Sequence, residues 1–312
     1  MAEPVALAAL MIEALVGWPD RLYRRVGHPV GLFAAIIMRC ETWWNRPTAH
    51  FAVRRAMGIL TMVSLVVLVG GTALALQHIA SAILGDRAWI ACALLAAVGL
   101  AQRSLFDHVR AVQRALATGD LNRSRKAVAM IVGRDVAELD EAGIARAAIE
   151  SLAESFCDGV AAPLFWLLVG GLPGLWIYKA INTADSMIGH KEERWRAFGW
   201  AAARTDDLLN LVPARLGGTL LCLVAPGGWR MMWRDARKHA SPNAGWTEAA
   251  MAGALDLRLA GPISYDGVIA DKPWIGDGHQ RATAQDIARG LAVYLRACLA
   301  LWLIAGGIAW AL

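Results

Sequence analysis

Two long uncharged runs constrain this chain more than any other feature of its sequence. Ala56–Gly85 is 30 residues with His78 as the sole His, Asp, Glu, Lys or Arg, and Gly159–Tyr178 is 20 residues with none. About 20 apolar residues in an α-helix cross the hydrocarbon core of a bilayer. Either run is therefore long enough to span, which predicts an all-α membrane protein.

Shorter apolar segments extend this prediction to a polytopic helical bundle. The chain is 57% hydrophobic and 18% charged, whereas soluble domains carry about a quarter charged residues. We expect one integral membrane domain over residues 1–312, with helical loops on the cytoplasmic side. The predicted membrane segments are about 4–17, 57–84, 88–106, 159–180, 208–226 and 290–312, and the polar stretches are 107–158, 182–207 and 227–289.

The distribution of basic residues predicts the topology. The segment Trp18–Met57 holds seven Arg, and loops rich in Lys and Arg stay in the cytoplasm. The run after it then crosses outward, turns at Gly85-Asp86-Arg87 and returns, which places 107–158 in the cytoplasm. This predicts a multi-pass protein of the cell (inner) membrane with its chemistry facing the cytoplasm.

The run Gly159–Tyr178 is interrupted by Pro163, Gly170-Gly171 and Pro173-Gly174. Non-helical backbone at membrane depth is tolerated where protein or a water-filled cavity surrounds it. We therefore expect either a broken or re-entrant segment that lines a site, or one kinked spanning helix.

Several common classes of protein are disfavoured by what the sequence lacks. The five Cys are scattered without a C-x-x-C pair, which disfavours a disulfide framework and a zinc site. No basic patch interleaves with aromatics, so nucleic acid is not an expected partner. The sequence has no P-loop, HExxH or GxSxG motif.

A ladder of charged residues precedes the broken segment. Arg146, Glu150, Glu154 and Asp158 follow one another at intervals of four, so on a helix they share one side. Stacked like charges are unfavourable, and Arg146 is placed to pair with Glu150. The remaining acids fit a magnesium ion held together with substrate phosphates; the alternative is a solvated helix face.

Two further polar sets flank the broken segment and the next apolar stretch. Polar groups within membrane segments are costly unless they are paired or functional. The first set is Lys179, Asn182, Thr183, Asp185, Ser186 and Lys191, and the second is Arg204, Asp206, Asp207, Asn210 and Arg215. In the second set, Arg204 and Asp207 are spaced to pair at i,i+3. Arg215 needs a partner or an anionic ligand.

A fourth set lies in the segment DARKHASPNAG, residues 235–245. Arg237, Lys238 and His239 precede a turn at Ser241 and Asn243, and a helix-like segment follows. Basic side chains at the start of a helix suit a phosphate or carboxylate. A solvated basic loop is the alternative.

Read together, these segments resemble the adenosylcobinamide-phosphate synthase family, the membrane proteins called CobD or CbiB. The resemblance covers most of the chain and is densest from about 133 to 262. It is carried by six ordered blocks: His28-Pro29-Val30, GRDVAELDE (133–141), ESLAESFCDGVAAPLFW (150–166), YKAINTADSMIGHK (178–191), RWRAFGWAAARTDDLLNLVPARL (194–216) and DARKHASPNAGWTEAAMAGAL (235–255).

This resemblance implies an ATP- and Mg²⁺-dependent ligase of cobalamin biosynthesis. Its substrates would be the corrinoid adenosylcobyric acid and aminopropanol phosphate, or ethanolamine phosphate, joined by an amide bond. Other late enzymes of the pathway, or a second copy of the chain, are further conceivable partners beside the lipid bilayer.

We assign the polar residues to roles as hypotheses within this reaction. Mg²⁺ and nucleotide phosphates are assigned to Glu150, Glu154, Asp158, Asp206 and Asp207. The reacting centre is assigned to Lys179, Asn182, Asp185 and Lys191. Substrate binding is assigned to Arg204, Asn210, Arg215, Arg237, Lys238, His239, Ser241 and Asn243.

Two other functions stay open on the residues alone. The broken segment and Arg215 also fit a transporter of a polar anion. Asp158-Gly159 is suggestive of a membrane phosphoalcohol transferase, although that class has Ala-Arg where Ala162-Pro163 stands here.

Overall fold

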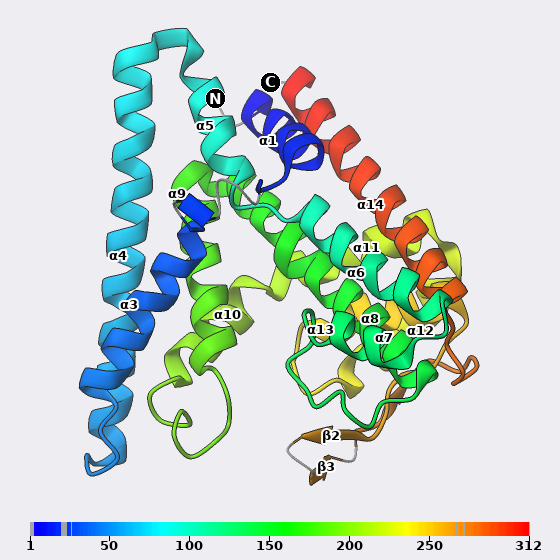
Figure 1. Ribbon diagram of the computed structural model, residues 1–312. Helices are drawn as coiled ribbons and strands as arrows, with labels where there is room; N and C mark the ends of the chain where they lie inside the picture. Colours follow the sequence, from blue (N-terminus) through cyan, green and yellow to red (C-terminus); the bar gives the residue numbers. More distant parts are fainter. Residues whose placement is uncertain (1–2, 20–23, 26, 266–267, 271, 312) are drawn as a thin grey trace. The chain divides into compact units, whose positions relative to one another are not determined.

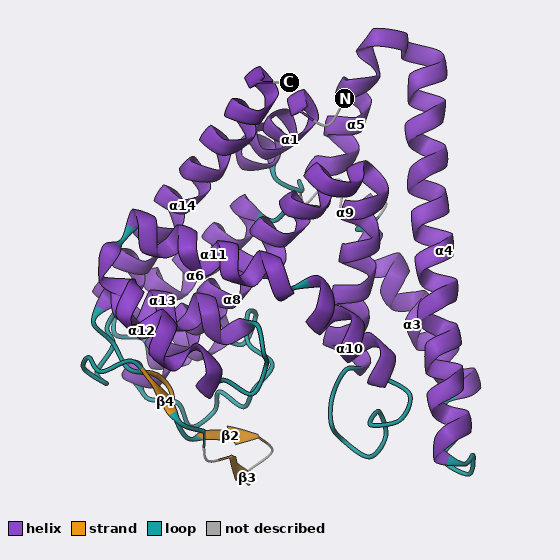
Figure 2. Ribbon diagram, turned by 180° about the vertical axis from the view of Figure 1, so that it is seen from behind, coloured by secondary structure: helices purple, strands orange, loops and turns teal. Residues whose placement is uncertain are grey.

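The computed structural model describes residues 3–19, 24, 25, 27–265, 268–270 and 272–311. Residues 20–23 and 26 of the basic segment 18–57, and residue 312 of the last predicted membrane segment, lie outside the described residues. The described part of the chain is mostly helical, with four short strands (Figures 1 and 2).

Within the described residues, three helical stretches are long and apolar enough to cross a membrane, by length and composition. They are Phe51–Ala117, Glu141–Ile188 and Ala284–Ala311, and the pair Trp200–Leu209 and Leu211–Val224, bent by 47°, would be a fourth. The prediction of an all-α membrane protein with a broken segment is thereby confirmed.

The chain forms two compact units, each built from segments distant in sequence. Unit 1 comprises residues 1–100, 162–210 and 305–312, and unit 2 comprises 101–161 and 211–304. The single membrane domain expected from the sequence stays a prediction, because compactness does not decide whether the units fold separately.

The helices of unit 1 are arranged around α9. The hairpin of α4 and α5 turns at the short helix η1, where Gly85 has φ 52°, so the predicted turn at Gly85-Asp86-Arg87 is confirmed (Figure 1). The elements of unit 1 are α1 (Glu3–Val16), α3 (Pro29–Trp44), α4 (Phe51–Leu84), η1 (Gly85–Arg87), α5 (Ala88–Ala97), α9 (Ala162–Ile188), α10 (Trp200–Leu209) and the end of α14 (Ala284–Ala311).

The apolar segment predicted over 88–106 is not one continuous helix, because α5 stops at Ala97, and its place in the membrane stays a prediction. A Cβ on Gly99 would lie 2.4 Å from Leu175 Cδ2, so the chain turns where Gly permits close approach. The next helix, α6 (Gln102–Ala117), is amphipathic and belongs to unit 2.

Helix α9 is broken where the sequence predicted. Gly171 has φ 61° and ψ −153°, a conformation that is essentially restricted to Gly, and Pro173 follows two residues later. A Cβ on Gly171 would also lie 3.2 Å from Gln77 Oε1 of α4. The break therefore depends on both the backbone freedom and the small size of Gly171.

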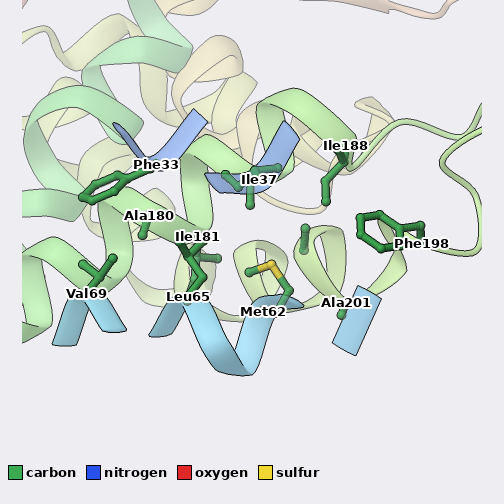
Figure 3. Close-up of a cluster of buried hydrophobic side chains, with 12 residues drawn as sticks. Phe33, Ile37, Met62, Leu65, Val69, Ala180, Ile181, Ile188, Phe198 and Ala201 are labelled. Atoms are coloured by element: carbon green, nitrogen blue, oxygen red, sulfur yellow. The ribbon is translucent and has the colours of Figure 1, made fainter. Parts of the chain in front are cut away.

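A buried apolar cluster fixes the second half of α9 in unit 1. Figure 3 shows side chains from α3, α4, α9 and α10 converging there. Asn182 lies on the side of α9 that faces away from this cluster, whereas the half-buried Asp185, four residues after Ile181, lies at the edge of the cluster. Its members are Phe33, Ile37, Met62, Leu65, Val69, Ala180, Ile181, Ala184, Ile188, Phe198, Ala201 and Ala202.

A polar cluster holds the loop between α9 and α10. Arg194 donates to both carboxylate oxygens of Glu41 at 2.9 Å, and Asn45 Nδ2 donates to Glu41 Oε1 at 3.1 Å. Arg54 Nε donates to Asn45 Oδ1 at 2.7 Å, and its Nη2 donates to the Glu193 carbonyl at 3.2 Å. The N-terminal turn of α4 is thereby tied to α3 and to this loop.

Unit 2 is built around the buried helix α13, which packs against α8, α11 and α12. Strand β1 pairs antiparallel with β4, and β2 with β3, which the purely helical expectation for 227–289 missed (Figure 2). The remaining elements of unit 2 are α7 (Leu121–Val128), α8 (Glu141–Phe156), η2 (Cys157–Ala161), α11 (Leu211–Val224), η3 (Pro226–Gly228), α12 (Trp229–Asp235), η4 (Ala236–Lys238), α13 (Ala244–Leu255), β1 (Leu259–Ala260), β2 (Ile263–Tyr265), β3 (Val268–Ala270), β4 (Trp274–Ile275) and most of α14.

Candidate functional site

The acidic ladder of α8 is regular over only part of its length. Asp140 caps the helix by accepting from the Gly143 N–H at 2.7 Å. Glu150 and Glu154 then lie one turn apart on one side, opposite a buried apolar side. The helix changes to a π-helical turn at Cys157–Ala161, so Asp158 no longer follows the regular α-helical spacing on which the predicted ladder was based. Such π turns are frequent at functional sites.

Glu150 is bound on both of its oxygens. Arg134 Nη2 donates to Oε2 at 3.0 Å, and the Ala260 N–H of β1 donates to Oε1 at 2.9 Å. Arg146, which the spacing placed to pair with Glu150, interacts with it electrostatically but forms no hydrogen bond with it, because Arg146 Nη1 donates to the Gln280 carbonyl at 2.6 Å. The loop residue Arg134, which sequence spacing did not indicate, takes that place.

A buried acid that the sequence analysis missed completes this cluster. Glu248 of α13 is 3% exposed, and its Oε1 lies 3.6 Å from Nε2 of His239. Burial, followed by the charges of Glu154 and Glu150, raises the pKa of Glu248 well above its usual range, whereas Lys272 and Arg134 oppose that shift. A lone acid within the apolar sequence of α13 was the signal that could have found it.

The segment 235–245 forms two local arrangements. Asp235 is fully buried, and it accepts from Arg234 at 2.6 Å, from Lys238 at 2.8 Å and from the Gly276 N–H at 2.8 Å. These hydrogen bonds to Arg234, Lys238 and Gly276 overcome the effect of burial and hold the pKa of Asp235 well below its usual range. Lys238 is therefore a structural partner of Asp235, besides being a predicted phosphate ligand.

The second arrangement joins the turn residues to Arg215. His239 Nδ1 accepts from the Ser241 N–H at 3.0 Å, and Ser241 Oγ accepts from the Asn243 N–H at 3.2 Å. Asn243 Oδ1 in turn accepts from Arg215 Nη1 at 3.1 Å. Burial, with a smaller contribution from Lys272, lowers the pKa of His239.

The partner expected for Arg215 is thus found within unit 2. Besides Asn243, its guanidinium lies 4.7 Å from the ring centroid of Trp246, and Arg237 is near enough to interact with it electrostatically. Two cations brought close together form an environment suited to an anion.

The predicted residues of α9 and α10 form a hydrogen-bonded network in unit 1. Tyr178 Oη donates to Asn210 Oδ1 at 3.0 Å, and Asn210 Nδ2 donates to Asp206 Oδ2 at 3.0 Å. Asn182 Nδ2 donates to the other oxygen of Asp206 at 3.3 Å. Asp206 is 8% exposed, so its carboxylate joins the two helices from the inside.

A more open charged group lies beside this network. Asp185 interacts electrostatically with Asp206 and Asp207, and also with His190 and Arg204. Arg204 Nη1 pairs with Asp207 Oδ2 at 3.1 Å, which confirms the predicted i,i+3 pair. The exposed Lys191 interacts electrostatically with Asp207 as well.

Lys179 has a neighbour in unit 1 that the spacing did not identify. Burial, with a smaller effect from the Lys179 ammonium, lowers the pKa of His28. His28 Nδ1 also accepts from the Val30 N–H at 3.2 Å at the start of α3, and its ring packs edge-on against Trp18 at 5.1 Å. The signal was the His-Pro-Val block, whose role the sequence left open.

The predicted site residues therefore fall into separate clusters. Unit 2 contains Glu150, Glu154, Asp158, Arg215, Arg237, Lys238, His239, Ser241 and Asn243. Unit 1 contains Lys179, Asn182, Asp185, Lys191, Arg204, Asp206, Asp207 and Asn210. Among the described residues, no three His, Cys, Asp or Glu side chains are arranged as a ready metal site.

These features define a helical membrane protein whose polar clusters combine carboxylates with arginine, lysine and histidine. The comparison with known proteins identifies its family. The family described as "CobD/Cbib protein" matches residues 6–294, and the chain belongs to it.

Several curated relatives match over nearly the whole chain, and each is called "Cobalamin biosynthesis protein CobD". The protein of Rhodobacter capsulatus is 48% identical over 306 residues, 97% of this chain and 96% of the relative. That of a Sinorhizobium species is 48% identical, with 96% of each chain covered, and that of Brucella anthropi is 45% identical, with 92% and 90% covered. No solved structure matches this chain.

Proposed function

We propose that this protein is an adenosylcobinamide-phosphate synthase of cobalamin biosynthesis. It would join adenosylcobyric acid to aminopropanol phosphate, or to ethanolamine phosphate, by an amide bond at the expense of ATP. Membership of the CobD/Cbib family, with relatives named for cobalamin biosynthesis, supports the pathway. The charged clusters of unit 2 support the chemistry.

The reaction requires activation of a poor electrophile. We propose that a carboxylate oxygen of the corrinoid attacks the γ-phosphorus of ATP, which releases ADP and forms an acyl phosphate. The amine then attacks the acyl carbon, inorganic phosphate leaves, and the amine nitrogen loses a proton to a base. Positioning and charge stabilisation carry most of the catalysis in phosphoryl transfer.

The observation that carries this proposal is the burial of Glu248 beside Glu150 and Glu154. Arg134 and Lys272 supply positive charge beside these three acids. A divalent cation would further relieve the repulsion among the three carboxylates. Magnesium commonly takes one or two carboxylates, with waters and substrate phosphates as its other ligands. The donor chemistry therefore fits Mg²⁺ bound with a nucleotide, and when bound it would neutralise phosphate charge.

Within this set the proposed roles differ. Glu154 is exposed on α8, and we assign it with Glu248 to the cation. Glu150 is committed to Arg134 and to the Ala260 N–H, so we now assign it to positioning Arg134. Asp158, Asp206 and Asp207 stay predicted as metal ligands.

The remaining assignments follow the local geometry of each unit. In unit 2, Arg215 and Arg237 would hold a phosphate, with the turn at His239, Ser241 and Asn243 beside them. In unit 1, Lys179, Asn182, Asp185 and Lys191 stay proposed for the reacting centre, and Arg204 and Asn210 for substrate binding.

We further propose that the protein is a multi-pass protein of the inner membrane with its site facing the cytoplasm. The basic segment 18–57 supports this orientation, and ATP is available on that side. Cysteine labelling of the Gly85-Asp86-Arg87 turn in intact cells tests it, because a turn on the outer side reacts with an impermeant reagent.

One assay tests the activity. The purified protein in detergent is supplied with adenosylcobyric acid, Mg²⁺, ATP and each amino alcohol phosphate in turn, and amide product and ADP are quantified. We expect stoichiometric ADP and product. Glu154→Gln should abolish the response to Mg²⁺, whereas Glu138→Gln, a change at an exposed acid outside the cluster, should not.

The broken helix α9 also fits one alternative function, that of a transporter of a polar anion. That function would show as flux into sealed vesicles without ADP or amide product. A phosphoalcohol transferase would instead consume a nucleotide-activated alcohol and release a nucleoside monophosphate.

A further inference from the structure

A cavity of about 360 Å³ lies in unit 2, outside the clusters described above. Its walls are the end of α11 at Val224, the turn η3, the end of α13 at Leu255, and one side of α14. Arg289 and Arg296 also line it, and the other lining residues are apolar or glycine.

The orientation of α14 is fixed by its other side. Tyr294 Oη donates to the Gln102 carbonyl at 2.8 Å, and Trp302 Nε1 donates to Gln102 Oε1 at 2.9 Å. The Tyr294 ring also packs edge-on against Phe156 at 5.9 Å. Since α14 is held there, Arg289 and Arg296, seven residues apart, face the cavity together.

The charge balance of the cavity is positive. Arg289 Nη1 pairs with Asp286 Oδ1 at 2.9 Å, while the other oxygen of Asp286 accepts from Thr283 at the start of α14. Arg296 forms no hydrogen bond or ion pair with any described residue. A guanidinium has five donors in a planar fork that matches a phosphate, so an anion would complete the site.

The position of Arg296 indicates where that anion comes from. It lies inside α14, a candidate membrane span, where an arginine is costly without an anionic partner. Continuing along the same side of the helix, Leu299 and Leu303 are 58% and 69% exposed, and Leu295 beside Arg296 is 50% exposed. An acyl chain could cover this apolar stripe, which a water-soluble phosphate would leave bare.

We propose that this cavity binds the phosphate of an anionic phospholipid. Arg296 and Arg289 hold the headgroup, and the chains lie against Leu299 and Leu303. Basic pockets between membrane helices are suited to such headgroups. The site is separate from the carboxylate cluster of Glu150, Glu154 and Glu248, and the inference does not depend on the proposed reaction.

The test measures which lipid the purified protein retains. The full chain is equilibrated with mixed micelles of equimolar phosphatidylglycerol and phosphatidylcholine, and retained lipid is quantified by native mass spectrometry. We expect selective retention of phosphatidylglycerol. Each of Arg289→Gln and Arg296→Gln should weaken it roughly fivefold, the factor for about 1 kcal/mol per basic residue near the bilayer surface.

A matched control separates the cavity from general charge. Arg281→Gln removes an exposed arginine just before α14 and should leave retention unchanged, and Arg296→Lys should retain more than Arg296→Gln. Equal retention by the wild type and the Arg289→Gln, Arg296→Gln double variant would overturn the proposal.

A competition arm, run on the wild type alone, distinguishes lipid from soluble phosphate. Glycerol phosphate added in excess should not displace phosphatidylglycerol, because it lacks the chains. If it displaces the lipid at a concentration similar to that of a short-chain phosphatidylglycerol, the site recognises phosphate alone and the lipid proposal fails.

Discussion

Nε2 of His239 lies 3.6 Å from Oε1 of Glu248, and burial disfavours the charged form of both groups. It lowers the pKa of His239 and raises that of Glu248. The pair is therefore a neutral contact more than an ion pair.

Glu248→Gln is expected to stabilise the protein at neutral pH in the absence of Mg²⁺. Because the folded state raises the Glu248 pKa, the wild type loses stability as pH rises above the unfolded value of about 4.3. The amide carries no such pH dependence. Thermal unfolding in detergent between mildly acidic and neutral pH should therefore show a shallower slope for the variant.

Added Mg²⁺ and nucleotide should reverse this order, because ligands that bind only the folded state stabilise it. We expect them to raise the melting temperature of the wild type more than that of Glu248→Gln. An equal rise in both proteins would argue against Glu248 as a cation ligand.

Asp235→Asn should destabilise unit 2 by about 3–5 kcal/mol, the typical cost of removing one partner from a buried ion pair. Its depressed pKa gives the wild type stability that is fully present above about pH 4 and lost as pH falls further. Denaturant unfolding measures both effects. Asp277→Asn, which removes the half-exposed partner of Arg234, should cost at most about 1 kcal/mol.

Gly171→Ala should destabilise the protein by about 1–3 kcal/mol, because Ala strongly disfavours the backbone conformation found there. Gly170→Ala is the matched control, since the new methyl group meets nothing within 4 Å. Its effect should stay within about 0.5 kcal/mol. Melting temperatures of the two variants in the same detergent check the prediction, and equal values would contradict it.

Asp206→Asn should cost about 1–3 kcal/mol, because an amide presents one acceptor to the two N–H groups of Asn182 and Asn210. Asp207→Asn removes the partly exposed pair with Arg204 and weakens the interaction with the exposed Lys191, and should cost at most about 1 kcal/mol. Comparing stability with activity for both variants separates a structural carboxylate from a catalytic one. A variant that keeps its stability and loses its activity would mark a catalytic role.

The sequence predicted features whose signal is local. The turn at Gly85, the break at Gly171 and the pair Arg204–Asp207 each depend on residues close together in the chain, and the structure confirms them. The end of α5 was missed because the apolar composition continues past Ala97, while the close approach of Leu175 to Gly99 comes from a segment distant in sequence.

Contacts distant in sequence could not be predicted from spacing. Glu150 was expected to pair one turn away with Arg146, but the fold brings Arg134 and the Ala260 N–H to it. Glu248 and Lys272 join the same cluster from α13 and from the chain after β3. Helical periodicity predicts the side of the helix on which an acid lies. The charges that surround the acid depend on which loops the fold brings to that side.

The length of α4 has a consequence for how a polar molecule approaches unit 1. Its 34 residues extend about 51 Å, some 20 Å beyond the hydrocarbon thickness of a bilayer. In the topology proposed above, the excess falls at the Arg54 end, because that end is bound to the charged loop that follows α9. Asp185 lies near the same loop. A multiply charged reactant would therefore reach Asp185 from the water phase, and the reactant would keep most of its hydration shell until it binds.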